Sequence, residues 1–193
     1  MRDASTASRR GSQRAGRVLS AFLRGRRGER GASLIEFALV AVPFFFLTFG
    51  TMELGLVLWG TYELENATED TARLIRTGQV HAQNIDADGF RTLVCERVVL
   101  LSQCETRLRL DVRTYASFAD IKNDNFQPLD PVTGQLGTTF QWQATQPRSI
   151  VLVRTFYPWP LFMGLTSAVL SNMAGGDRLL WATAVFRNEA WPI

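Results

Sequence analysis

Side chains that could carry out catalysis are sparse in this chain of 193 residues. Its single histidine, His81, lies in a polar stretch and is expected to be an exposed residue. Asp86 and Asp88 precede an apolar helical pattern, so helix capping suits them better than acid–base chemistry. The turn-like Gly175–Asp177 lacks the further glycines and the lysine of a phosphate-binding loop. The sequence therefore predicts that the protein is not an enzyme and binds no cofactor.

The two cysteines, Cys95 and Cys104, lie close together in the sequence. In a domain outside the cytoplasm, such a pair predicts a disulfide. The closed loop would be short, with an entropic stabilisation of roughly 3 kcal/mol. The alternative is two buried free thiols. A zinc site would need further ligands, and His81 is the only histidine, so no metal site is expected.

The stretch from residue 28 to residue 60 holds a pattern that suggests a different kind of chemistry. An arginine-rich arm ends at Gly31, Ala32 follows, and a single carboxylate, Glu36, precedes an apolar run. A cut after Gly31 would make Ala32 the first residue and Glu36 the fifth. The new ammonium group would then lie near a carboxylate of the same or a neighbouring helix, and pairing would satisfy both charges in an apolar environment. In an uncut chain, Glu36 is more simply an interfacial residue that reaches back to water.

The apolar run extends from Phe37 to Trp59 and is interrupted by Glu53. A helix rises about 1.5 Å per residue, so this run is long enough to cross a hydrocarbon core of roughly 30 Å. Glu53 would lie near the outer border of the membrane, and we expect its side chain to reach outward to water. The run is too long for an ordinary secretory signal, and no clear small-residue cleavage site follows it.

The basic arm, Gly31, Glu36 and the long apolar helix together resemble type IV prepilins. The pair Glu36–Phe37 is similar to the Glu-Tyr or Glu-Phe pair of the tight-adherence (Flp pilus) branch. The strong resemblance covers residues 28–77. Major Flp pilins are far shorter than this chain, so the chain resembles a minor pilin.

The C-terminal sequence adds to this resemblance. Arg187, Asn188 and Glu189, after Phe186, look like the tail of TadE-like proteins. A proline and an aromatic residue usually follow in that family. Here an alanine replaces the proline, and Trp191 supplies the aromatic residue.

The resemblance to TadE-like proteins implies a non-catalytic minor pilin or pseudopilin of a tight-adherence pilus or a type II-related secretion machine. A prepilin peptidase would cut between Gly31 and Ala32, and Glu36 would act in assembly. The implied partners are other pilins or pseudopilins and an inner-membrane assembly platform. Two alternatives stay open: an uncleaved single-pass structural component of the same machine, and a membrane-anchored exported enzyme or ligand-binding protein. The sequence does not decide whether such a protein enters, primes or caps a filament.

Charge is divided unevenly along the chain. Residues 1–31 contain nine arginines and two acidic residues, which gives this part +7; the total is +3, so the rest carries −4. Because the arm directly precedes a membrane helix, the positive-inside rule explains it better than nucleic-acid binding does. We expect a single-pass protein of a bacterial inner membrane, in contact with lipid. Its arm would be cytoplasmic and its C-terminal domain periplasmic or extracellular.

Three parts are expected: a leader at 1–31, a long helix at 32–78 and an exported domain at 79–193. Helical spacing continues beyond the apolar run to Thr77, Gly78 is a suitable stop, and Pro43 would kink the helix.

The exported domain is predicted to be α+β, with helices packed on a small antiparallel sheet. After a polar loop at 79–88, a helix capped by Asp86 or Asp88 would carry Phe90, Leu93, Val94, Val98 and Leu101 on one side. Strands are expected at 107–115, 150–157 and 179–186, with Pro158–Pro160 ending the second strand. In the first strand, Arg107, Arg109, Asp111 and Arg113 would form a solvated face. A long surface loop is expected at 119–148, with Phe140 and Trp142 as an edge strand, and a short apolar helix at 161–170.

Overall fold

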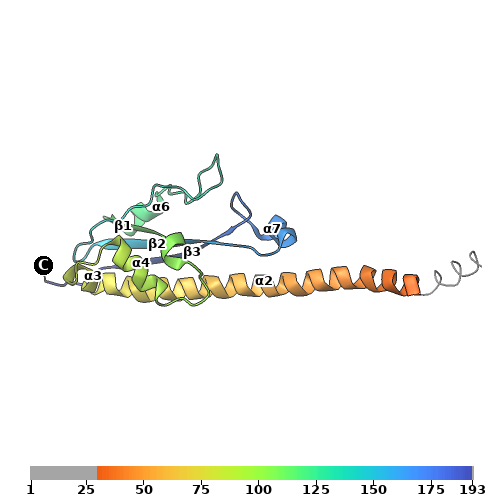
Figure 1. Cartoon of the computed structure of the whole chain (residues 1–193). Coiled ribbons are helices and arrows are strands. Elements are labelled where there is room, and N and C mark those ends of the chain that lie inside the picture. The colour runs from red at the N-terminus through yellow and green to blue at the C-terminus, as the bar shows by residue number, and fades with distance from the viewer. Residues whose placement is uncertain (1–29, 193) are drawn as a thin grey trace, which may run out of the picture. The chain divides into compact units, whose positions relative to one another are not determined.

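One long helix, α2 (Arg30–Arg76), contains the apolar run and continues past it (Figure 1). The computed structural model describes residues 30–192, with side chains from Ser33 onward except at Leu165, so most of the predicted leader lies outside the described residues. The helix ends one residue before the predicted Thr77. Gly78 adopts a positive φ of 79°, and its N–H donates to the carbonyl of Ile75 at 3.0 Å. This left-handed conformation is why a glycine stops the helix here.

The chain divides into two compact units, residues 1–49 and 50–193. The described part of the first unit is helix alone, and most of its large apolar side chains are exposed, Leu39 by 72%. By length and composition, α2 is the one helix among the described residues that could cross a membrane. This agrees with a single-pass membrane protein.

The second unit contains a three-stranded antiparallel sheet in the order β1-β2-β3. The strands are β1 (Arg109–Tyr115), β2 (Ile150–Trp159) and β3 (Arg178–Arg187). Together with α2 they confirm the predicted α+β class. β2 is the central strand, as its nearly continuous apolar sequence predicts.

Pro158 does not end β2, contrary to the expectation. The strand continues to Trp159, and Pro158 is paired with Leu179 of β3. The pairing with β1 reaches only Phe156, opposite Arg109. At Pro158 the strand therefore has a neighbour on one side only, where a missing N–H need not break a ladder.

The core lies between one face of the sheet and the part of α2 that follows Gly50. Figure 1 shows this part of the helix running beneath the strands. Leu64 is fully buried, and the Thr68 hydroxyl lies 2.7 Å from that of Thr155 on β2. At Gly60 the contact is so close that a Cβ atom would lie 2.7 Å from the Trp159 ring. The apolar and small side chains of this helix face thus hold the sheet against it.

Helix α4 (Ala87–Cys95) begins as predicted but ends earlier than predicted. Asp86 caps it by accepting a hydrogen bond from the Gly89 N–H at 2.8 Å. Val98 and Leu101 lie beyond its end, in a segment that leads to α5 (Cys104–Arg107). Because α5 takes up Arg107, β1 begins two residues later than expected. The predicted polar loop at 79–88 also contains a short helix, α3 (Gln79–Ala82).

The segment between β1 and β2 is folded onto the sheet rather than being a plain surface loop. It contains α6 (Phe118–Lys122), capped by Ser117 and Asp120 in a capping box. Trp142 forms a single bridge with Val112 of β1, which is all that remains of the expected edge strand. The rings of Phe126 and Phe140 lie 5.7 and 5.5 Å from that of Phe156 on β2. A short helix, α7 (Gly164–Leu170), connects β2 to β3 and lies within the predicted 161–170 helix.

Candidate functional site

Glu36 lies in the exposed first part of α2. Gly31 and Ala32 belong to the first turn of the same helix, and their side chains are outside the described residues. Glu36 and most of the large apolar residues along residues 34–49 are exposed. An apolar helix surface of this extent is typical of a segment that contacts lipid or other helices. The functions predicted for Gly31, Ala32 and Glu36 stay predictions.

Glu53 is buried, which corrects the expectation that its side chain reaches outward to water. Only 4% of the residue is exposed. One carboxylate oxygen accepts hydrogen bonds from the backbone N–H groups of Phe162 and Met163, at 2.5 and 3.4 Å. The other accepts from the Thr166 hydroxyl of α7. Hydrogen bonds from residues far away in the sequence therefore offset the free energy needed to bury this carboxylate.

The outer face of β1 is covered at Asp111 and Arg113, which corrects the prediction of a solvated strand face there, whereas Arg109 is exposed as predicted. Asp111 is fully buried and lies 3.0 Å from the Arg113 Nε and 3.3 Å from the Arg154 Nη1. Arg154 also contacts Asp124 at 2.5 Å, and both arginines lie over the Phe126 ring, each 4.7 Å from its centre. Arg113 and Arg154 are thus paired within the domain.

Tyr115 and Asp124 are coupled at the edge of this cluster. The Tyr115 hydroxyl donates to Asp124 at 2.7 Å. Burial, with help from this hydrogen bond, raises the pKa of Tyr115. Burial alone would raise the pKa of Asp124 as well, but hydrogen bonds from Tyr115 and Arg154, together with the charges of Arg154 and Arg113, outweigh it and lower that pKa. The charged Asp124 carboxylate is therefore part of what holds the 116–149 segment on the sheet.

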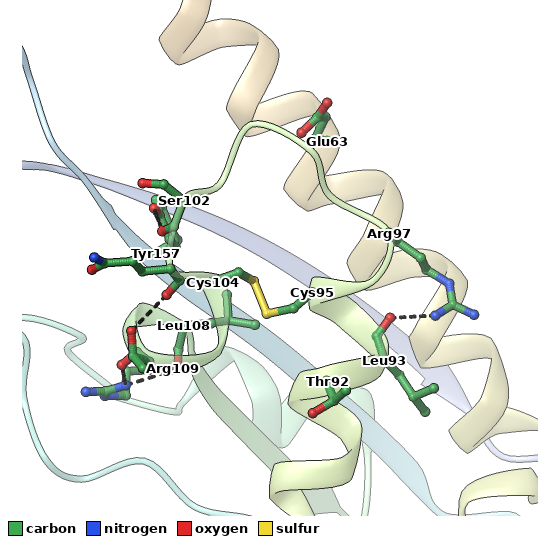
Figure 2. Close-up of a disulfide and its surroundings, with 12 residues drawn as sticks. Glu63, Thr92, Leu93, Cys95, Arg97, Ser102, Cys104, Leu108, Arg109 and Tyr157 are labelled. Atoms are coloured by element: carbon green, nitrogen blue, oxygen red, sulfur yellow. Dashed lines mark hydrogen bonds between the residues drawn. A yellow bond between two sulfur atoms is a disulfide. The ribbon is translucent and has the colours of Figure 1, made fainter.

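The predicted disulfide between Cys95 and Cys104 is present, with a Cα–Cα distance of 5.6 Å. Figure 2 shows it connecting the end of α4 to the start of α5. The residues between the cysteines are also held from two other directions. The Glu63 carboxylate of α2 accepts from the N–H groups of Val99 and Leu100, at 3.0 and 2.9 Å. The Tyr157 hydroxyl donates to the Ser102 carbonyl at 2.6 Å.

The C-terminal motif fastens the end of the chain to the end of α2. Asn188 is buried; its backbone N–H donates to the Ser149 carbonyl at 2.8 Å and its side-chain amide to that of Gln146 at 2.9 Å. The Glu189 N–H donates to the Arg76 carbonyl at 3.0 Å, and the two side chains lie 3.7 Å apart.

Arg187 ends β3, and Trp191 lies over Gly78, where a Cβ atom would come within 2.6 Å of its ring. Fastening the chain end in this way is a structural task, and it explains why the motif follows the last strand directly.

Two of the residues weighed for catalysis share one depression, but the geometry gives each a different role. His81 and Asp86 both line a partly open hollow together with Ile75, Val80 and Trp142. His81 is exposed, as predicted, and Asp86 is the cap of α4. Within residues 30–192, no three histidine, cysteine, aspartate or glutamate side chains come together as a set of metal ligands.

Sequence reasoning missed Glu53, Glu63 and Asp111 as residues with buried or long-range partners. The signal available for Glu53 was its position as the one acidic residue inside an apolar run. For Asp111, it was a single acid among arginines on one strand face. Neither pattern identifies the distant partners, which lie 30 or more residues away.

A comparison with protein families finds a match to the model described as TadE-like protein over residues 31–73. No curated protein and no solved structure matches the chain. The matched segment begins at Gly31, includes Glu36 and Glu53, and ends three residues before α2 does. It confirms the resemblance of the N-terminal helix to TadE-like proteins and points to a component associated with a tight-adherence pilus.

Proposed function

We propose that this chain is a non-catalytic minor pilin, or pseudopilin, that acts in the assembly of a tight-adherence pilus or a related secretion machine. The observation that carries the proposal is the exposed apolar helix of residues 34–49, which lies inside the TadE-like match. Such a surface needs lipid before assembly and the helices of other pilins afterwards. The domain that begins near Gly50 would then be carried on this helix.

The proposed chemistry is one cut followed by one charge pairing. A prepilin peptidase would cut between Gly31 and Ala32, removing the basic leader of residues 1–31. The new Ala32 ammonium would pair with the Glu36 carboxylate of its own or a neighbouring helix. In an apolar environment, each charge stabilises the other.

The proposed topology places the arm in the cytoplasm and the domain of residues 79–193 outside it, with the helix of residues 32–78 between them. The positive arm and the disulfide both support this orientation. The partners would be the prepilin peptidase, other pilins or pseudopilins, the inner-membrane platform and membrane lipid. No nucleic acid is expected to bind.

The decisive test is Glu36→Gln, which keeps the size of the side chain and removes its charge. Glu36 makes none of the domain contacts described above, so we expect a membrane-inserted protein with its disulfide intact. Cross-linking to other pilins and piliation should be lost, because the ammonium would have no partner. The matched control is Glu65→Gln, an exposed acid on the same helix. Normal piliation with Glu36→Gln would leave Glu36 as an interfacial residue.

Cleavage is tested separately by the mass of the protein extracted from membranes. The mature chain should begin at Ala32, and Gly31→Leu should block the cut by crowding the peptidase site. An intact arginine-rich arm in cells with an active peptidase would contradict processing. That result would favour the alternative of an uncleaved structural component of the same machine.

A further inference from the structure

We propose that the segment Leu161–Leu170, which contains α7, rests in the outer interface of the membrane and is a second contact of this protein with lipid. We call this segment the foot. The inference rests on the proposed single-pass topology and adds a membrane-binding surface in the exported domain.

The foot lies in the middle of a long stretch without charge. From Thr155 to Gly176 the sequence contains no aspartate, glutamate, lysine, arginine or histidine. Part of this stretch is the buried strand β2, which explains its apolar residues up to Trp159. The foot follows the strand and is not covered in the same way.

Large apolar side chains of the foot point away from the domain. Phe162 is 73% exposed and Val169 is 79% exposed. Gly164 and Ala168 are exposed as well, so this surface has no charged side chain to solvate it. An uncharged surface rich in exposed apolar side chains is typical of a segment that enters the boundary between headgroups and acyl chains.

Glu53 determines where along α2 the foot lies. Its carboxylate accepts from the N–H groups of Phe162 and Met163 and from the Thr166 hydroxyl. A Cβ atom built at Gly50, one turn earlier on the helix, would lie 3.5 Å from the Thr166 methyl group. The foot is therefore docked on α2 at residues 50–53.

Helix length places this docking level at the outer border of the membrane. From Leu34 to Glu53 a helix rises about 30 Å, the thickness of the hydrocarbon core. A span that starts just after the arginine-rich arm therefore leaves the core near Glu53. Farther along, Trp59 and Tyr62 are exposed, as expected for aromatic residues at an interface.

This placement also explains why a carboxylate, Glu53, is found within an apolar run. A bare charge at this depth would be costly, but here it is satisfied by groups of the foot. Next to the docking level, Met52 and Leu54 of α2 are exposed apolar residues as well, by 64% and 42%. Exposed apolar side chains on both α2 and the foot, at the level where the span leaves the hydrocarbon core, are why we commit to lipid as the occupant.

The test uses the full chain with its disulfide intact, inserted into lipid vesicles. Single cysteines replace Phe162 or Val169 and carry an environment-sensitive fluorophore. Val132→Cys is the matched control. Val132 is also a highly exposed apolar residue, at 91%, but it lies outside the foot, in the segment between β1 and β2. Val42→Cys reports on the span itself. Spin-labelled lipids with shallow labels and aqueous iodide serve as the two quenchers.

We expect shallow lipid labels to quench the probes at 162 and 169 several-fold more than the probe at 132, and iodide to show the reverse order. Probes at 162 and 169 that behave like the probe at 132 would refute the proposed contact between the foot and lipid. If the probe at 42 is still quenched by lipid in that case, the proposed membrane span stands. Shielding from both quenchers that grows with protein density would mean that a second copy covers this surface, which also overturns lipid as the occupant. A probe at 42 that iodide reaches would refute the span and the proposed function together.

Discussion

At the scale of single residues, Glu53 shows how long-range contacts can bury a charged side chain that the local sequence would place in water. In the sequence it interrupts an apolar run, so a side chain that reaches water is the simplest expectation. In the folded domain it accepts two backbone hydrogen bonds and one from a hydroxyl. The carboxylate thus connects α2 to the segment between β2 and β3.

Replacing this carboxylate should loosen the connection. Glu53→Gln puts an amide N–H₂ group where one of two acceptor oxygens now lies, so either the backbone donors or Thr166 lose their partner. We expect a loss of about 1–3 kcal/mol of domain stability, the cost of hydrogen bonds to a charged group. Hydrogen exchange should quicken mainly in residues 161–170. The exposed Glu65→Gln should change neither, and equal exchange in both variants would contradict a role for Glu53.

The Asp124 carboxylate makes a second residue-scale prediction, which concerns pH. Its folded-state pKa lies below the ordinary value of 3.8, because hydrogen bonds from Tyr115 and Arg154 and the charges of Arg154 and Arg113 together outweigh burial. The stability that it contributes is therefore present above the unfolded pKa and is lost as the pH falls through the folded one. Asp124→Asn should cost about 1–3 kcal/mol at neutral pH.

The same variant should also lose part of the decline in stability between about pH 5 and pH 2 that the unmodified protein shows. Denaturant unfolding across this range measures both effects. The exposed Asp70→Asn is the control and should keep the acid decline. An Asp124→Asn protein with an unchanged acid profile would refute the argument.

At the scale of elements, the segment between α4 and α5 is held by three kinds of contact. The disulfide joins its two ends, Glu63 of α2 binds its backbone, and Tyr157 of β2 binds the carbonyl of Ser102. The contact with Glu63 is one reason why the helix does not continue to Leu101, although apolar spacing does. The backbone N–H groups of Val99 and Leu100 are directed to the Glu63 carboxylate and not to a helix carbonyl.

Removing the disulfide should lower stability without abolishing the fold. The double change of Cys95→Ser and Cys104→Ser removes a short covalent loop, for which we expect a loss of about 2–3 kcal/mol. Glu63 and Tyr157 keep the segment in place, so the circular dichroism of the folded protein should change little. Denaturant unfolding with and without reductant checks the prediction, and reductant should have no effect on the double variant. Complete unfolding of that variant would contradict the role given to the other two contacts.

At the scale of the whole molecule, the chain combines a helix with an exposed apolar surface and a domain that has its own core. The disulfide belongs to that domain, and the positive charge is concentrated in the arm. Both features favour an arm in the cytoplasm and a domain in an oxidising compartment.

Topology can be measured with a membrane-impermeant maleimide on single introduced cysteines. We expect Val132→Cys to react in intact spheroplasts, because Val132 is 91% exposed in the domain that is proposed to be exported. Ser8→Cys, in the arm of an uncleaved strain, should react only after lysis. Labelling of Ser8→Cys before lysis would contradict the proposed orientation.

Local patterns were sufficient for much of this protein. The long helix, its stop at Gly78, a cap at Asp86 or Asp88, the three strands and the disulfide were all predicted from neighbouring residues. Each depends on chemistry that acts within a few positions: helical or alternating spacing, a positive φ at glycine, a side chain that caps its own helix, and two cysteines close in sequence.

Tertiary structure decided where the charges and the chain ends lie. The partners of Glu53 are at least 109 residues away, and Arg154 reaches Asp111 across 43 residues. Pro158 is tolerated in β2 because the pairing with β1 does not extend past Phe156. In each case the local sequence permits several outcomes, such as a charge in water or a charge in a network. Only the folded chain brings a distant donor, acceptor or strand edge close enough to select one, since hydrogen bonds and ion pairs act over a few ångströms.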